Sequence, residues 1–139
     1  MSRRERRRKQ QAVLQTIFEA TARGDGRPYR DALADDVTFT VVASNAWART
    51  YVGKASVLKD LLIPVGGNFT GPNQVSAYNF IAEGDMVVVE GRNHSVTKTG
   101  PAYPQQYCWI IRMRDGKMAE VKEYADTALV DRVLAPPVG

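Results

Sequence analysis

Residues 107–126 read YCWIIRMRDGKMAEVKEYAD and contain two runs with the two-residue period of β-strands. The first run is large and apolar at every second position, and Glu123 lies on the more apolar face of the second run. The dipeptide Asp115-Gly116 between the two runs is a strong signal for a hairpin turn. The stretch therefore predicts an antiparallel β-hairpin whose apolar face carries one carboxylate.

The chain on either side of this hairpin changes from helical to strand-like periodicity. Ser2 and Glu5 have the spacing of a capping box, and Gly24 is a suitable stop, so one helix is expected between them. Further helices are expected after Pro28, over KASVLKDLLIPVGG (54–67), and over TALVDRVL (127–134) with Asp126 as its N-cap. Strands are expected at VTFTVVA (37–43), QVSAYNFIAEGD (74–85) and MVVVEGRNHSVTKTG (86–100). Helices first and antiparallel strands afterwards predict an α+β fold, with helices packed on one face of a curved sheet.

The 139 residues predict one domain over 11–134, with a loose tail over 135–139. The formal net charge of +4 is unevenly distributed, because residues 1–10 hold six basic side chains and one acidic one. The rest of the chain keeps 13 of the 19 basic and 14 of the 15 acidic residues and is nearly neutral. The basic arm is interpreted as a helix extension or a disordered segment, with a phosphate-binding tail as the alternative. It contains no aromatic residue to stack on a base, which argues against nucleic-acid binding.

Several functional classes are excluded by what the sequence lacks. No run of about 18 apolar residues predicts a membrane span, and no apolar segment follows the basic start, so a cytoplasmic protein is expected. Cys108 is the only cysteine and His94 the only histidine, which leaves no disulfide and no zinc-ligand set. A glycine-rich phosphate loop and a dinucleotide fingerprint are also missing. We therefore expect neither a metal nor a cofactor.

The strand VVVEGRNHSV (87–96) places Glu90, Arg92 and His94 two residues apart, and therefore on one face. If that face points into a cavity, the three side chains could perform acid–base chemistry. If it points to solvent, Glu90 and Arg92 form a surface ion pair and His94 is a structural residue. The strand by itself leaves both interpretations open.

Taken together, four segments resemble the nuclear transport factor 2-like superfamily over roughly residues 10–132. They are ARGDGRPYRDALADDVTF (22–39), YVGKASV with Gly53, the strand at 87–96 and the hairpin at 107–126. Within that superfamily the chain looks most like SnoaL-like polyketide cyclases, ketosteroid isomerases and limonene epoxide hydrolases. The resemblance implies a cone-shaped half-barrel, in which a strongly bent sheet wraps a helix and encloses a deep apolar pocket. It also implies a homodimer through the outer face of the sheet and a small, mostly apolar substrate.

The same resemblance implies a set of site residues. Limonene epoxide hydrolases carry an arginine and an aspartate two apart on the long strand, and a second aspartate on the last strand. The matching positions are Arg92, His94 and Glu123, so histidine stands where an aspartate is expected. The resulting hypothesis is a His94–Glu123 acid–base pair oriented by Arg92. Substrate contacts are expected from Phe39, Trp47, Gln105, Tyr107 and Trp109.

These observations favour a cofactor-independent enzyme that uses acid–base catalysis on a small apolar molecule with a carbonyl or an epoxide. The chemistry would be proton transfer or isomerisation, aldol-type cyclisation, or activation of water. Limonene epoxide hydrolysis itself is not expected, because Phe39 replaces a polar residue of that family. The alternative is a non-catalytic ligand-binding or dimerisation module, since fold alone does not determine function.

Overall fold

The first helix, α1 (Arg3–Ala22), begins and ends where the sequence predicts in the computed structural model, which describes residues 1–137. The Ser2 hydroxyl accepts a hydrogen bond of 3.1 Å from the backbone N–H of Glu5, which is half of a capping box. Gly24, at a φ of 81°, lies just beyond the end of the helix. One face of α1 is buried against the sheet through Leu14, Ile17, Phe18, Ala20 and Thr21.

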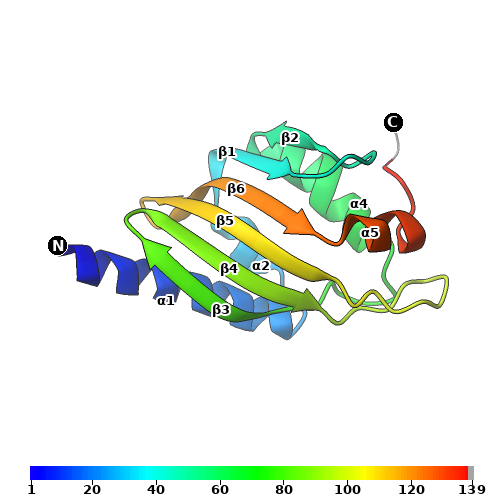
Figure 1. The fold of residues 1–139 in the computed structure, drawn as a ribbon, viewed down its shortest axis with the longest axis horizontal. Coiled ribbons are helices and arrows are strands. Elements are labelled where there is room, and N and C mark those ends of the chain that lie inside the picture. The colour runs from blue at the N-terminus through cyan, green and yellow to red at the C-terminus, as the bar shows by residue number, and fades with distance from the viewer. Residues whose placement is uncertain (138–139) are drawn as a thin grey trace.

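Six strands form one curved sheet that does not close into a barrel (Figure 1). They are β1 (Leu33–Val41), β2 (Arg49–Val52), β3 (Val75–Glu83), β4 (Met86–Asn93), β5 (Gln106–Arg114) and β6 (Lys117–Ala125). Their order across the sheet is β2-β1-β6-β5-β4-β3. Only β1 and β6 pair in parallel, and the other neighbours pair antiparallel. The predicted α+β fold with a curved mixed sheet around N-terminal helices is confirmed.

The predicted hairpin at residues 107–126 joins β5 to β6. Asp115 has a φ of 53° and Gly116 a φ of 75°, so both central residues are left-handed, as a two-residue hairpin turn of type I′ requires. The resulting register pairs Trp109 with Glu123 directly across the two strands. A directly opposed pair lies on one face of the sheet, so this turn brings the Glu123 carboxylate beside an indole ring.

Three strand assignments differ from the prediction. The strand predicted over 86–100 ends at Asn93. β1 begins at Leu33 instead of at residue 37, because the short helix α2 (Arg27–Asp31) ends before Ala32. β2 (Arg49–Val52) was not predicted, because no element was expected between residues 43 and 54. Its only buried side chain is Tyr51, so it carries little of the hydrophobic alternation that predicts a strand.

The predicted helix at 54–67 forms as one continuous helical segment. It consists of α3 (Lys54–Ser56), a turn of π-helix η1 (Val57–Leu62) and α4 (Ile63–Gly66). The last helix, α5 (Thr127–Val133), begins as expected, with the side chain of Asp126 accepting from the N–H of Leu129. Figure 1 shows α4 and α5 together at one end of the sheet.

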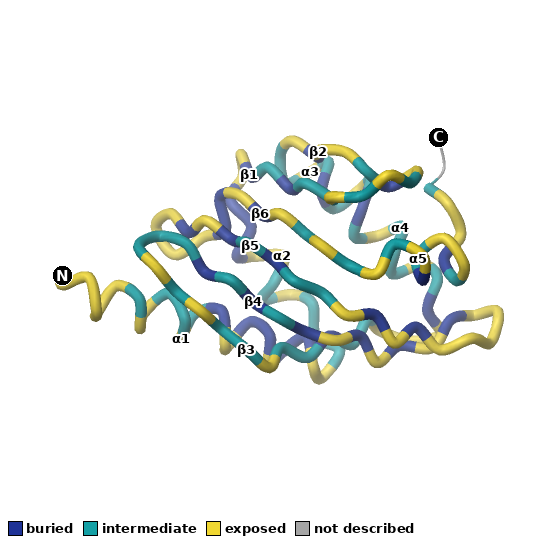
Figure 2. The backbone as a smooth tube through the Cα atoms, viewed as in Figure 1, coloured by how far each residue is buried: buried dark blue, intermediate teal, exposed yellow. Residues whose placement is uncertain are grey.

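The basic arm is the start of α1, whose first turns extend past the sheet and are exposed (Figures 1 and 2). Arg7 makes a 3.6 Å ion pair with Glu83 at the end of β3. None of the helices within residues 1–137 combines the length and the hydropathy needed to cross a membrane. Of the tail predicted for 135–139, residues 138–139 lie outside the described part of the chain.

Candidate functional site

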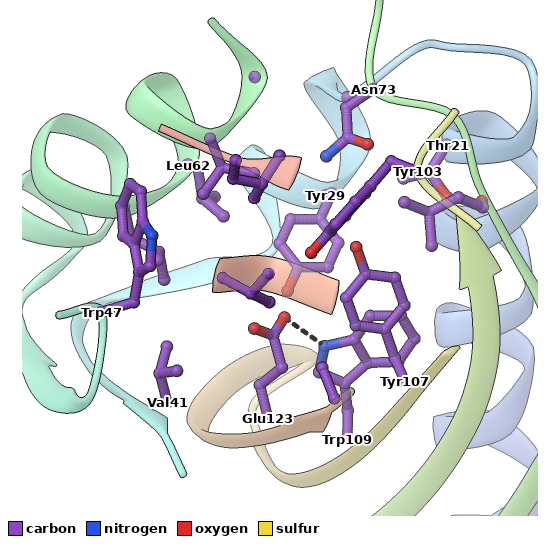
Figure 3. Close-up of a pocket in the computed structure, with 18 of the residues that line it drawn as sticks. Thr21, Tyr29, Val41, Trp47, Leu62, Asn73, Tyr103, Tyr107, Trp109 and Glu123 are labelled. Carbon is purple, nitrogen blue, oxygen red and sulfur yellow. Dashed lines mark hydrogen bonds between the residues drawn. The ribbon is translucent and has the colours of Figure 1, made fainter. Parts of the chain in front are cut away.

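A cavity of about 560 Å³ lies between the concave face of the sheet and the helices at its wide end (Figure 3). Its walls come from α1, α2, the helical segment of residues 54–66, the start of α5, and the strands β1, β5 and β6. Most of the lining is apolar, and it includes Phe18, Val41, Trp47, Leu61, Leu62, Val65, Val75, Trp109, Val130 and Leu134. A cavity of this size and polarity fits a small apolar molecule.

Glu123 is the only carboxylate that lines this cavity among residues 1–137. Its Oε1 accepts a hydrogen bond of 2.9 Å from Nε1 of Trp109. Within the described residues, no other group hydrogen-bonds to this carboxylate. Burial raises the pKa of the Glu123 carboxyl above the ordinary 4.5, and the hydrogen bond from Trp109 opposes part of that rise. A carboxylate in this state is a stronger base near neutral pH than one in water.

The Trp109 ring that holds Glu123 is itself fixed by aromatic packing. It stacks on the ring of Tyr107 at a centroid distance of 4.6 Å, and the Phe18 ring lies 5.1 Å away on α1. On the neighbouring strand β4, Gly91 leaves room for the indole. The position of the carboxylate therefore depends on packing among three elements of the fold.

Three tyrosine hydroxyls share the cavity with Glu123, those of Tyr29, Tyr103 and Tyr107 (Figure 3). The hydroxyl of Tyr29 makes no hydrogen bond within residues 1–137. Burial raises the pKa of Tyr103 to about 12 and raises the pKa values of Tyr29 and Tyr107 well above the usual 10, and the nearby Glu123 carboxylate adds to each rise. All three phenols therefore keep their protons at neutral pH and are available as hydrogen-bond donors.

The structure corrects the predicted inward face of β4. Val87, Val89, Gly91 and Asn93 are buried on the inner face, whereas Arg92 and His94 are exposed on the outer face. The Arg92 guanidinium lies 4.9 Å from the centre of the exposed Tyr78 ring. The structure therefore does not bring Arg92 or His94 to Glu123, and the predicted acid–base pair does not form.

Glu90 does not form the expected ion pair with Arg92 within residues 1–137. Its Oε1 accepts a hydrogen bond of 2.9 Å from Nδ2 of Asn79 on β3. The physical reason for the error on this strand is that Val87, Val88 and Val89 are apolar on both faces. The alternation therefore did not show which face of the strand is buried, and the ionisable residues were assigned to the inner face instead of the outer one.

The five expected substrate contacts divide into two groups. Trp47, Tyr107 and Trp109 line the cavity. Phe39 is fully buried in the core and is not part of the lining, so that expectation was wrong. Gln105 is also fully buried behind the cavity wall, where its amide joins the start of β5 to the backbone of Asp126.

Sequence reasoning missed Tyr29 and Tyr103 as lining residues and Asn93 as a buried polar one. Tyr29 lies in the short helix α2, and nothing in the sequence connects that helix with the last strand. Tyr103 lies in the connection before β5, and Asn93 lies between the two ionisable residues that drew attention instead. Within residues 1–137, no group of three or more His, Cys, Asp and Glu side chains is placed to hold a metal ion.

Comparison with known proteins identifies the family to which this fold belongs. Residues 14–121 match the family model of the SnoaL-like domain. An NTF2-like protein of unknown function from Burkholderia pseudomallei K96243 is 20% identical with a TM-score of 0.76, and covers 91% of this chain and 98% of its own. A protein assigned as a SnoaL-like polyketide cyclase from Jannaschia sp. CCS1 is 16% identical with a TM-score of 0.74, and covers 95% of both chains.

A third solved structure, TerC co-crystallised with polyporic acid, is 20% identical with a TM-score of 0.74. The alignment covers 90% of this chain and 97% of TerC. At such identities, the likeness to these three structures shows the fold alone. No curated protein matches the sequence significantly.

Proposed function

This chain belongs to the SnoaL-like domain family within the nuclear transport factor 2-like superfamily, and from that premise we propose that it is a cofactor-independent enzyme acting on a small carbonyl compound. In this proposal Glu123 removes a proton from the carbon next to the carbonyl group. The observation that carries it is the single buried carboxylate with a raised pKa in a largely apolar cavity.

The proposed step balances as a proton transfer. A Glu123 oxygen takes the proton, the electrons of the C–H bond form the enolate, and its negative charge develops on the carbonyl oxygen. Returning the proton to a different carbon completes an isomerisation. In an aldol-type ring closure the enolate carbon instead attacks a second carbonyl, whose oxygen then takes the proton back from Glu123. Phenol hydroxyls in the cavity are suitable donors to the developing negative charge.

Proton transfer is favoured over hydrolysis of an epoxide by the charges in the cavity. The hydrolysis hypothesis needed Arg92 and His94 to position and activate a water molecule, and both residues lie on the outer face of β4. Glu123 is then left without a second carboxylate or a histidine to share that task. The neighbours support the general class, because one is assigned as a polyketide cyclase and TerC was co-crystallised with polyporic acid.

Hydrogen–deuterium exchange at carbon tests this proposal without knowledge of the natural substrate. A panel of cyclic and aryl ketones is incubated with the protein in D₂O, and loss of the α-proton signals is followed by NMR. We expect accelerated exchange for ketones that fit the cavity, and Glu123→Gln should reduce the rate by about a hundredfold or more.

Glu120→Gln is the matched control, because it makes the same change on the same strand at an exposed position, in an ion pair with Arg112. It should leave exchange unchanged. Equal exchange in the wild type and Glu123→Gln would contradict the proposed base. Tight binding of ketones without any exchange would instead favour a non-catalytic ligand-binding module.

A further inference from the structure

The direction of the hydrogen bond at Tyr107 is determined by a backbone group two residues beyond the end of β4. The N–H of Ser95 donates to Oδ1 of Asn93 at 2.7 Å, and a backbone N–H can only donate. The amide of Asn93 is thereby oriented with its NH₂ group toward the Tyr107 hydroxyl at 3.2 Å and toward Oδ1 of Asn73 at 2.7 Å. The phenol oxygen of Tyr107 must therefore accept this hydrogen bond.

The hydroxyl of Tyr103 also accepts a hydrogen bond from an oriented side-chain amide, in this case that of Gln105. Oε1 of the fully buried Gln105 accepts from the backbone N–H of Gln106 at 2.9 Å and from that of Asp126 at 2.8 Å. Its NH₂ group consequently points to the Tyr103 hydroxyl at 3.0 Å and to the carbonyl of Asp126 at 2.9 Å. The phenol oxygen of Tyr103 is an acceptor here as well.

Each phenol still has its own proton to donate. Within residues 1–137, neither hydroxyl donates to a protein acceptor, and both residues line the cavity. Figure 3 shows the two hydroxyls facing the same part of the cavity, near Glu123. Their proximity is also visible in the pKa of Tyr107, which burial and the neighbouring Tyr103 both raise.

We propose that Tyr103 and Tyr107 form a donor-only subsite that binds the carbonyl oxygen of an apolar ketone, with Asn93 and Gln105 as positioning residues. A ketone oxygen has two lone pairs and no proton, so it accepts from both phenols and leaves no polar group unpaired. A protonated nitrogen has no lone pair and cannot accept from either phenol. The subsite deepens the proposed function, because it would hold the oxygen on which the enolate charge develops. In this respect the inference rests on the proposed function.

The first test compares benzophenone with diphenylmethane, which differ only by replacement of the carbonyl group with CH₂. Calorimetric titration should show tighter binding of benzophenone, and the carbonyl stretch of ¹³C-labelled benzophenone should shift to lower frequency on binding. Tyr103→Phe and Tyr107→Phe should each weaken benzophenone binding about two- to tenfold and reverse part of the frequency shift. Tyr124→Phe, at an exposed position of β6, is the matched control and should change neither. Diphenylmethane binding should not respond to any of the three substitutions.

A second test reverses one hydrogen bond without removing the hydroxyl. Asn93→Asp keeps an acceptor for the N–H of Ser95, but it replaces the NH₂ group that faces Tyr107 with a second acceptor oxygen. The Tyr107 proton should then turn to this carboxylate, and benzophenone should lose as much affinity and frequency shift as it does in Tyr107→Phe. A purely structural role of Asn93 would not produce this equivalence, and the two tyrosine substitutions keep the test decisive if Asn93→Asp does not fold.

These measurements need no turnover, so they separate the subsite from the proposed reaction. A carbonyl shift that depends on Tyr103 and Tyr107, in a protein that exchanges no α-protons, would support the subsite and remove the proposed enzyme function. Equal binding of benzophenone and diphenylmethane, or a carbonyl frequency unchanged by Tyr103→Phe and Tyr107→Phe, would overturn the subsite whether or not exchange occurs.

Discussion

Replacing Gly91 with alanine tests whether packing between β4 and β5 holds the Trp109–Glu123 pair in place. A β-carbon at residue 91 would lie 2.7 Å from the carbonyl oxygen of Ser76 and 2.8 Å from Cζ3 of Trp109. Both distances are shorter than normal contacts, and one of the two atoms belongs to the backbone of a paired strand. Gly91 does not have a positive φ, so the added methyl group acts through its volume and not through the backbone conformation.

The expected cost follows from the atoms that must move. The Trp109 ring has little freedom, because it is 4% exposed and stacks on Tyr107. An added methyl group in such a site costs about 1–3 kcal/mol of unfolding free energy. For 139 residues, an unfolding entropy of about 2.1 cal/mol/K per residue gives a decrease in Tm of about 3 °C per kcal/mol. Gly91→Ala should therefore lower Tm by about 3–10 °C.

Thermal unfolding followed by circular dichroism measures this change. Tryptophan emission, recorded in a Trp47→Phe background so that only Trp109 contributes, reports the displacement of its ring. Gly71→Ala is the control, because a β-carbon there meets no atom within 4 Å and its φ is not positive. A Tm of Gly91→Ala equal to that of Gly71→Ala would refute the packing argument. An unchanged Tm together with altered emission would mean that the ring moves freely, and would refute the claim that packing fixes Glu123.

Three further predictions concern the site and its surroundings. Because burial raises the pKa of Glu123 above 4.5, the folded state holds this proton more tightly, and the unfolding free energy should fall as pH rises from about 4.5 through the raised pKa. Glu123→Gln should lack that decrease in urea unfolding across the same pH range, and parallel curves would sink the assignment of a raised pKa. Gln105→Ala removes the hydrogen-bond partner of the Asp126 backbone N–H, whereas the Asp126 carbonyl still accepts from the N–H of Val130. The lost bond should cost about 1–3 kcal/mol by urea unfolding, and a near-neutral result would mean that water replaces the amide. His94→Ala and Arg92→Ala alter exposed side chains and should change stability by about 0.5 kcal/mol or less, and α-proton exchange not at all. A large loss of α-proton exchange in either variant would mean that the substituted residue takes part in the reaction.

The elements with strong local signals were predictable from sequence. The capping box at Ser2, the helix stop at Gly24 and the turn at Asp115-Gly116 each depend on backbone conformation over a few residues. Alternation along the last strand also placed Glu123 on the apolar face. In each case the determining interaction is local, so the sequence contains it directly.

The inner face of β4 could not be predicted in the same way. Periodicity places Arg92 and His94 together, but it does not say which side of the sheet they occupy. That choice was made by the neighbours of Gly91, because only a residue without a side chain fits between Ser76 and the Trp109 ring. Those contacts join three strands, so they cannot be predicted from the sequence of one strand.

Local patterns along the chain are enough to predict the α+β class, the likeness to the SnoaL-like family and the carboxylate that lies in the cavity. The residues that accompany that carboxylate can be identified only in the folded chain. Tyr29, Tyr103 and Glu123 come from a helix, a connection and the last strand, and they meet because the sheet curves around α1. The sum of many long-range packing contacts sets that curvature, and no local pattern records it.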